Sequence, residues 1–192
     1  PSCVTRRRIL IVLGAVALVA ILIVGLGQSK GIDEQTTTQS AAEMTRDLAG
    51  SPPRLAALHA QANELLDGNA ATVQRRIASL KGFPVVVNMW GSWCPPCRLE
   101  MPDIVAAYEK HKEAGFVVIA VNLEESAAKI TPFAEEFGMA LPIVMDDGTA
   151  ARAYQVRVMP SSFFIDRDGK VSARWLGVLT PSLIEKNLAP IL

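Results

Sequence analysis

The pair Cys94 and Cys97 is the part of this sequence best suited to carry chemistry. Only Pro95 and Pro96 separate the two thiols, and cysteines at this spacing can close a small disulfide with little backbone movement. A thiolate attacks a disulfide and forms a mixed disulfide, which a second thiol then resolves. The spacing therefore favours redox exchange through a Cys94–Cys97 disulfide.

The elements expected around the pair assign a role to each cysteine. Residues 84–90 are short, β-branched and apolar, which is typical of a buried strand, and residues 98–114 read as a helix. A cysteine at a helix N-terminus faces unpaired N–H groups and the positive end of the helix dipole, which favour its thiolate. We therefore expect Cys94 to be the exposed attacking thiol and Cys97 the more enclosed resolving thiol.

A zinc site and a cysteine hydrolase are the alternatives for a Cys-x-x-Cys segment. Structural zinc needs about two further ligands, and the other candidates are Cys3, His59 and His111, none of which forms a ligand-like pair. We expect no metal and no other cofactor. His111 lies several turns along the expected helix and should not reach Cys94, whereas His59 stays open as a base, with a surface histidine as its other interpretation.

The N-terminal segment predicts a membrane anchor. Residues 9–27 carry no charge, and a helix of that length crosses the hydrocarbon core of a bilayer. Arg6, Arg7 and Arg8 precede this run, so residues 1–8 are expected to be a cytoplasmic basic stub and the rest to be exported. The prediction is a single-pass signal anchor in the cell membrane, with an extracytoplasmic domain. A cleaved signal peptide and a buried core helix are the alternatives.

Composition adds limits on function and organisation. The 192 residues hold 19 basic and 19 acidic side chains, a balance that does not indicate a nucleic-acid partner. Residues 28–53 are polar and predict a flexible linker, and residues 54–192 form one domain. Within it, residues 54–80 read as an N-terminal helical extension of two helices. The first, 54–66, has leucines at helical spacing, and the second is capped by Asn69 and runs through Leu80. Of three cysteines, only Cys3 lies outside the pair, so no second disulfide can staple an exported domain.

The remaining pattern predicts a mixed-sheet α/β sandwich. Strand-like and helix-like segments alternate and then end in a hairpin and a helix. The expected strands are 116–122, 142–145, 161–165 and 171–176, and the expected helices are 126–137, 149–154 and 181–188.

The stretch from Val85 to Pro102, which includes Trp93-Cys94-Pro95-Pro96-Cys97, resembles the active-site segment of thioredoxin-like proteins of the TlpA/ResA type. Met159–Asp166 resembles the family's cis-proline loop and the strand after it, and Asp168–Val171 resembles the next hairpin. The resemblance covers residues 81–192. It implies an α/β thioredoxin-like mixed sheet with flanking helices, here preceded by the N-terminal transmembrane helix. Many relatives open with a β-hairpin, which 54–80 does not resemble.

The resemblance also implies roles for four residues outside the cysteine pair. Pro160 is expected to be cis beside the pair, and Met159 to pair with an incoming peptide. Trp93 is expected to give an apolar contact surface for that substrate. Glu100 matches an acidic residue that would exchange a proton with Cys97, the alternative being a solvated helical glutamate. Asn88 stands where cytosolic thioredoxins have a buried aspartate, which favours Glu100 in this role.

These observations predict an extracytoplasmic thiol–disulfide oxidoreductase that acts on protein dithiols and disulfides, with a membrane redox partner and a role in cytochrome c maturation. One alternative is a non-catalytic module that binds client peptides on the same fold. Another is a thiol peroxidase, which would want a lone peroxidatic cysteine with Thr and Arg nearby rather than Pro95-Pro96.

Overall fold

The computed structural model describes residues 64–192, together with Pro53, Leu55, Ala57 and Gln61. The predicted basic stub (1–8), the predicted transmembrane anchor (9–27) and the predicted linker (28–53), apart from Pro53, lie outside the described residues. Among the helices that the structure describes, none combines the length and the hydropathy needed to span a bilayer.

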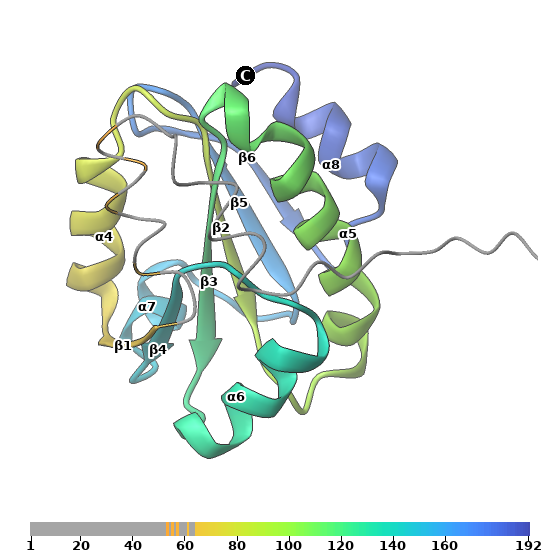
Figure 1. Cartoon of the computed structure of the whole chain (residues 1–192). Helices are drawn as coiled ribbons and strands as arrows, with labels where there is room; N and C mark the ends of the chain where they lie inside the picture. The colour runs from red at the N-terminus through yellow and green to blue at the C-terminus, as the bar shows by residue number, and fades with distance from the viewer. Residues whose placement is uncertain (1–52, 54, 56, 58–60, 62–63) are drawn as a thin grey trace, which may run out of the picture. The chain divides into compact units, whose positions relative to one another are not determined.

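A six-stranded mixed sheet forms the centre of the domain, in the order β1-β4-β3-β2-β5-β6 (Figure 1). The first four strands in that order are parallel, and β5 and β6 are antiparallel to their neighbours. The strands are β1 (Leu65–Gly68), β2 (Val85–Trp90), β3 (Val117–Leu123), β4 (Ile143–Asp146), β5 (Ser161–Ile165) and β6 (Val171–Leu176). The predicted mixed-sheet α/β class is confirmed.

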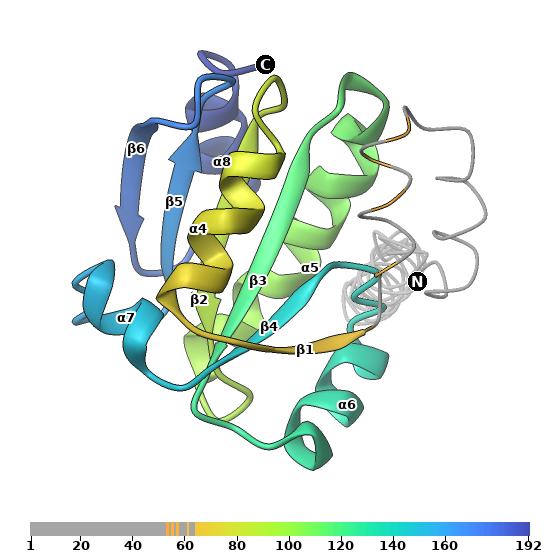
Figure 2. The ribbon, with the colours of Figure 1, turned by 90° about the vertical axis from the view of Figure 1, so that its left-hand side faces the viewer.

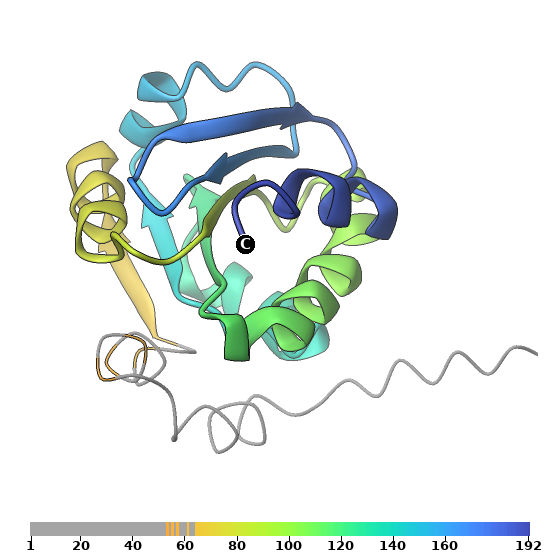
Figure 3. The same cartoon turned by 90° about the horizontal axis from the view of Figure 1, so that it is seen from above.

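Helices cover both faces of this sheet, so its central strands are apolar on both sides. Figure 2 and Figure 3 show α4 and α5 on opposite faces. The helices are α4 (Ala70–Ser79), α5 (Pro95–His111), α6 (Ala127–Glu136), α7 (Thr149–Ala153) and α8 (Pro181–Leu188), and a 3-10 turn, η2 (Lys112–Ala114), follows α5. Strand β2 is buried along its whole length. Its alternate side chains enter two separate cores, one beneath α4 and α7 and the other beneath α5, α6 and α8.

The prediction of two helices over residues 54–80 is half right. Helix α4 is confirmed, and Asn69 caps it by accepting a hydrogen bond from the Thr72 N–H at 3.0 Å. The first helix was expected to continue to Leu66, but Leu65–Gly68 is strand β1 and pairs in parallel with β4. The helix-like spacing of leucines was misleading, because the backbone groups of Leu65 and Leu66 pair with a neighbouring strand. Residues 65–80 are therefore part of the sheet and its cover, and not an extension.

Candidate active site

The cysteine pair lies at the junction of β2 and α5, as the sequence predicts. A four-residue turn follows β2 and is closed by the Cys94 N–H donating to the Gly91 carbonyl at 3.1 Å. Cys94 is the N-cap of α5, and Pro95 and Pro96 form its first positions. Proline suits these positions because their N–H groups have no partner within the helix. The two cysteines are joined in a disulfide with their Cα atoms 5.3 Å apart.

The Cys94 sulfur faces the start of α5. The Cys97 N–H donates to the Cys94 Sγ at 3.2 Å, a contact that would stabilise a thiolate at this position. The expectation of an exposed Cys94 is wrong for this disulfide form, because Cys94 is only 2% exposed. Its bond to the fully buried Cys97 keeps it within the apolar core beneath α5.

Glu100 is a buried carboxyl one turn after Cys97, so the solvated alternative is excluded. The Leu179 N–H donates to its Oε2 at 2.7 Å, and the Asn88 amide donates to its Oε1 at 2.8 Å. Burial raises the pKa of Glu100 to about 7, although the two hydrogen bonds act in the opposite direction; the nearby Asp103 charge adds a smaller increase. The group can therefore take up and release a proton near neutral pH.

Asn88 connects Glu100 to a third element. Its amide nitrogen also donates to the Ser162 Oγ at 3.0 Å, so β2, α5 and β5 meet in one buried polar cluster. The Asn88 Oδ1 is buried and has no hydrogen-bond partner among the residues that the structure describes. If the Asn88 amide turns over, this oxygen can accept a hydrogen bond from the O–H of a neutral Glu100 carboxyl.

The Met159–Pro160 peptide bond is cis, as the resemblance implies. Ser161, the next residue, pairs with Met89 of β2, which places Pro160 beside the end of β2 where the turn to Cys94 begins. The Pro160 carbonyl accepts a hydrogen bond from the Gly177 N–H at 2.9 Å. The half-buried Met159 packs against both cores.

Exposed apolar side chains gather on the segments that adjoin the disulfide. Trp93 is 61% exposed and Leu99 is 72% exposed, and both flank the cysteine pair in sequence. Val158 precedes the cis bond, and Leu176 pairs with Ser161 just after it; both are also exposed. The Trp93 indole lies over Gly91, where an added Cβ would be 2.8 Å from the ring.

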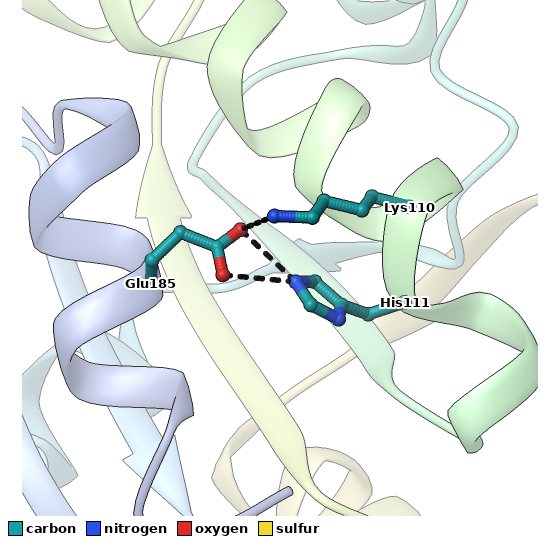
Figure 4. A network of polar contacts seen from close by, with 3 residues as sticks. All are labelled: Lys110, His111 and Glu185. Carbon is teal, nitrogen blue, oxygen red and sulfur yellow. Dashed lines mark hydrogen bonds and ion pairs between the residues drawn. The ribbon is translucent and has the colours of Figure 1, made fainter.

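His111 lies far from the cysteines, as the sequence predicts, and its side chain contacts a carboxylate of α8. Its Nε2 lies 3.0 Å from the Glu185 Oε1, and the Lys110 Nζ donates to the same oxygen at 2.8 Å (Figure 4). This network joins the last turn of α5 to α8, at the opposite end of α5 from Cys94. Within the part of the chain that the structure describes, no group of three or more His, Cys, Asp or Glu side chains could hold a metal ion. His59 lies outside the described residues.

Sequence reasoning missed Glu125, which lies just after β3 and bonds to the turn before Cys94 through Ser92. The sequence feature that could have identified Glu125 is its place just after the carboxyl end of an expected central strand. Strands β2 and β3 were both expected to be buried and central, and the residues that follow the carboxyl ends of parallel strands meet at one edge of a sheet.

Comparison with known proteins gives the same chemistry. Residues 57–174 match the AhpC/TSA family. The chain is 37% identical over 119 residues to the thiol-disulfide oxidoreductase ResA of Geobacillus kaustophilus, a match covering 62% of this chain and 68% of that protein. It is 36% identical over 121 residues to ResA of Bacillus subtilis, a match covering 62% of this chain and 66% of that protein.

Solved structures agree on the fold. A putative thiol:disulfide interchange protein DsbE from Chlorobium tepidum superposes with a TM-score of 0.56 at 30% identity, covering 60% of this chain and 84% of that one. A thioredoxin family protein from the same organism gives a TM-score of 0.56 at 28% identity, covering 59% and 83%. With the disulfide at the β2–α5 junction, these matches show that the chain belongs to the AhpC/TSA family and, within its thioredoxin-like members, to the thiol–disulfide oxidoreductases of the ResA type.

Proposed function

We propose that this chain is a membrane-tethered extracytoplasmic oxidoreductase that exchanges disulfides with cysteines of exported proteins. The observation that carries the proposal is the Cys94–Cys97 disulfide at a helix N-terminus, one turn from the buried carboxyl of Glu100. Burial raises the pKa of that carboxyl to about 7. The relatives named ResA are oxidoreductases of this chemical class.

In the reducing direction, the Cys94 thiolate attacks one sulfur of a client disulfide. A mixed disulfide forms, and the other client sulfur leaves as a thiolate. Cys97 then attacks the Cys94 sulfur and releases the second client thiolate. Two electrons pass from the dithiol to the client, and the Cys94–Cys97 disulfide remains. The reverse sequence oxidises a client dithiol. A reduction potential measured against glutathione decides which direction prevails.

Glu100 is proposed to handle the proton of Cys97. The resolving thiol must lose its proton before it attacks, in a core where the proton has few other acceptors. A carboxyl with a pKa of about 7 holds or releases a proton at neutral pH, whereas a solvated glutamate would stay ionised. The Asn88 amide and the Leu179 N–H hold the carboxyl in place for either state.

The surface around the disulfide supports a protein substrate. A client cysteine beside Cys94 would lie among exposed apolar side chains, including Trp93 and Leu99, and its backbone could pair with Met159. An apocytochrome c is a fitting client, because its haem-attachment segment contains a Cys-x-x-Cys-His motif. An oxidised peptide with that motif, compared with a scrambled peptide of equal composition, tests this part of the proposal. Equal rates with both peptides would argue against it.

The membrane anchor is proposed from residues 9–27 and the three arginines before them. An enzyme that turns over repeatedly also needs a redox partner to restore its working state, and we propose a membrane protein in this role because the enzyme is tethered. Fractionation of cells that express the full chain is expected to recover the protein with membranes, and protease added outside the cytoplasm is expected to digest the domain. Recovery in the soluble exported fraction would indicate cleavage instead.

Disulfide exchange with insulin or an oxidised peptide gives the decisive test. Cys94→Ser is expected to abolish turnover, and Cys3→Ser, which removes the only other thiol outside the pair, is the matched control and should keep it. Turnover by Cys94→Ser equal to that of the native chain would overturn the proposal. Client binding that ignores both cysteines would identify a binding module, and fast turnover of hydrogen peroxide would identify a peroxidase.

A further inference from the structure

The turn that carries the attacking cysteine is bonded to the loop after β3. Ser92 is a central residue of the turn from Gly91 to Cys94. Its N–H donates to the Glu125 Oε2 at 2.6 Å, and its hydroxyl donates to the Glu125 Oε1 at 2.5 Å. One carboxylate therefore binds both polar groups that Ser92 offers as donors, two residues before Cys94.

A third hydrogen bond holds the same carboxylate. The buried Asn122, in β3, donates its side-chain N–H to the Glu125 Oε2 at 2.8 Å. Burial alone would raise the pKa of Glu125, but the bonds from Ser92 and Asn122 and the Lys129 charge lower it below its usual value. The group is thus an ionised acceptor at neutral pH, anchored to the end of a central strand.

From this geometry we propose that Glu125 is a positioning residue, which acts through Ser92 to hold the Cys94 sulfur against the first turn of α5. The inference rests on the proposed attacking role of Cys94. With the turn held, the Cys94 Sγ stays in reach of the Cys97 N–H, now at 3.2 Å, and that donor stabilises the thiolate. Without Glu125, the Ser92 N–H and hydroxyl lose their partner, and the turn is free to move the sulfur away from the donor.

Two possible roles of Glu125 predict opposite changes in the pKa of the Cys94 thiol when Glu125 is removed. If it acted only as a nearby negative charge, its removal would lower the pKa of the Cys94 thiol, because a like charge disfavours the thiolate. If it positions the turn, its removal raises that pKa. Glutamine separates the roles further. Its carbonyl can accept from the Ser92 N–H and from Asn122, and its amide can donate to the Ser92 hydroxyl, so the contacts survive without the charge.

The test measures alkylation of Cys94 by iodoacetamide against pH, in the full chain carrying Cys3→Ser and Cys97→Ser. Cys94 is then the only thiol. In this background Glu125→Ala is expected to raise the midpoint pH of alkylation by about 0.5 to 1 pH unit. At neutral pH it should slow the alkylation about three- to tenfold. Glu125→Gln should stay close to the background value. Glu124→Ala removes a neighbouring exposed carboxylate and should change neither quantity.

An unchanged or lowered midpoint in Glu125→Ala, at a melting temperature near that of the background, would overturn the inference. If Glu125→Ala does not fold, Ser92→Ala removes only the hydroxyl contact and should raise the midpoint by a smaller amount; no rise would overturn the inference equally. The alkylation assay needs no client, so its result can be interpreted even if the proposed disulfide exchange with clients is not observed.

Discussion

Replacement of Glu100 by glutamine should change how stability depends on pH. The native carboxyl is buried and has a pKa of about 7, against an ordinary value of 4.5. The folded state therefore binds this proton more tightly than the unfolded state does. The contribution of the protonated carboxyl is fully present below pH 4.5 and is lost as the pH rises through 7. Since one pKa unit corresponds to about 1.4 kcal/mol, this loss amounts to roughly 3 kcal/mol.

Glutamine should fit the same space without the titration. Its carbonyl can accept from the Leu179 N–H. Its amide would take the place of the Oε1 that accepts from the Asn88 amide nitrogen, so it can donate to the Asn88 Oδ1 once the Asn88 amide turns over. The free energy of unfolding of Glu100→Gln, minus that of the native chain, is therefore expected to rise by about 3 kcal/mol between pH 4.5 and pH 7.5. Titratable groups common to both chains cancel in this difference.

The assay is a urea titration of the full, oxidised chain in mild detergent at several pH values, followed by near-ultraviolet circular dichroism. The disulfide is intact, so neither Cys94 nor Cys97 titrates. Glu113→Gln, an exposed change in η2, is the control and should give a curve parallel to the native one. A difference between Glu100→Gln and the native chain that stays constant over the whole range would contradict this expectation, because Glu100 would then titrate alike in the folded and unfolded states.

Three further substitutions test other parts of the site. Cys97→Ser should trap a client–Cys94 mixed disulfide on a non-reducing gel, because the resolving thiol is lost; turnover without any adduct would contradict the assignment. Gly91→Ala should push the Trp93 indole from its place and raise KM for a peptide disulfide about threefold or more, with kcat little changed, and an unchanged KM would speak against a contact role. Arg98→Ala removes an ion pair and two cation–π contacts with α6 and its C-cap, and should cost about 1 kcal/mol in chemical denaturation; no measurable loss would show that they contribute nothing.

The sequence was most informative where structure is decided locally. Strand β2, the hairpin between β5 and β6, and α8 were predicted at nearly their observed bounds, because each has a clear pattern and clear ends. The helix expected over 98–114 is displaced by three residues, because α5 begins at Pro95 and ends at His111. Strand β1 was missed because four residues with two adjacent leucines also fit a helix. What makes them a strand is pairing with β4, far along the chain.

The candidate active site also combines features decided by neighbouring residues with features decided by residues far along the chain. The identity of the cysteine pair and its position at a helix N-terminus follow from neighbouring residues, but the burial of Cys94 and Glu100 does not. Glu100 is buried because α5 packs beside the segment before α8, where the Leu179 N–H meets its carboxylate. The cis bond at Pro160 was implied only by the family resemblance, since nothing in Met159–Pro160 by itself favours that isomer.

The partners of Glu100 and Asn88 have a consequence for the order in which an exported chain acquires its properties. Leu179 is 79 positions beyond Glu100, and Ser162 is 74 positions beyond Asn88, whereas the two cysteines are three positions apart. A chain that is exported N-terminus first therefore exposes both thiols well before the segments that enclose the Glu100 carboxyl arrive. Until then, Glu100 is an ordinary solvated acid, and the cysteines have no buried proton acceptor. Redox capacity belongs to a short early segment, and control of the proton comes only with the completed sheet.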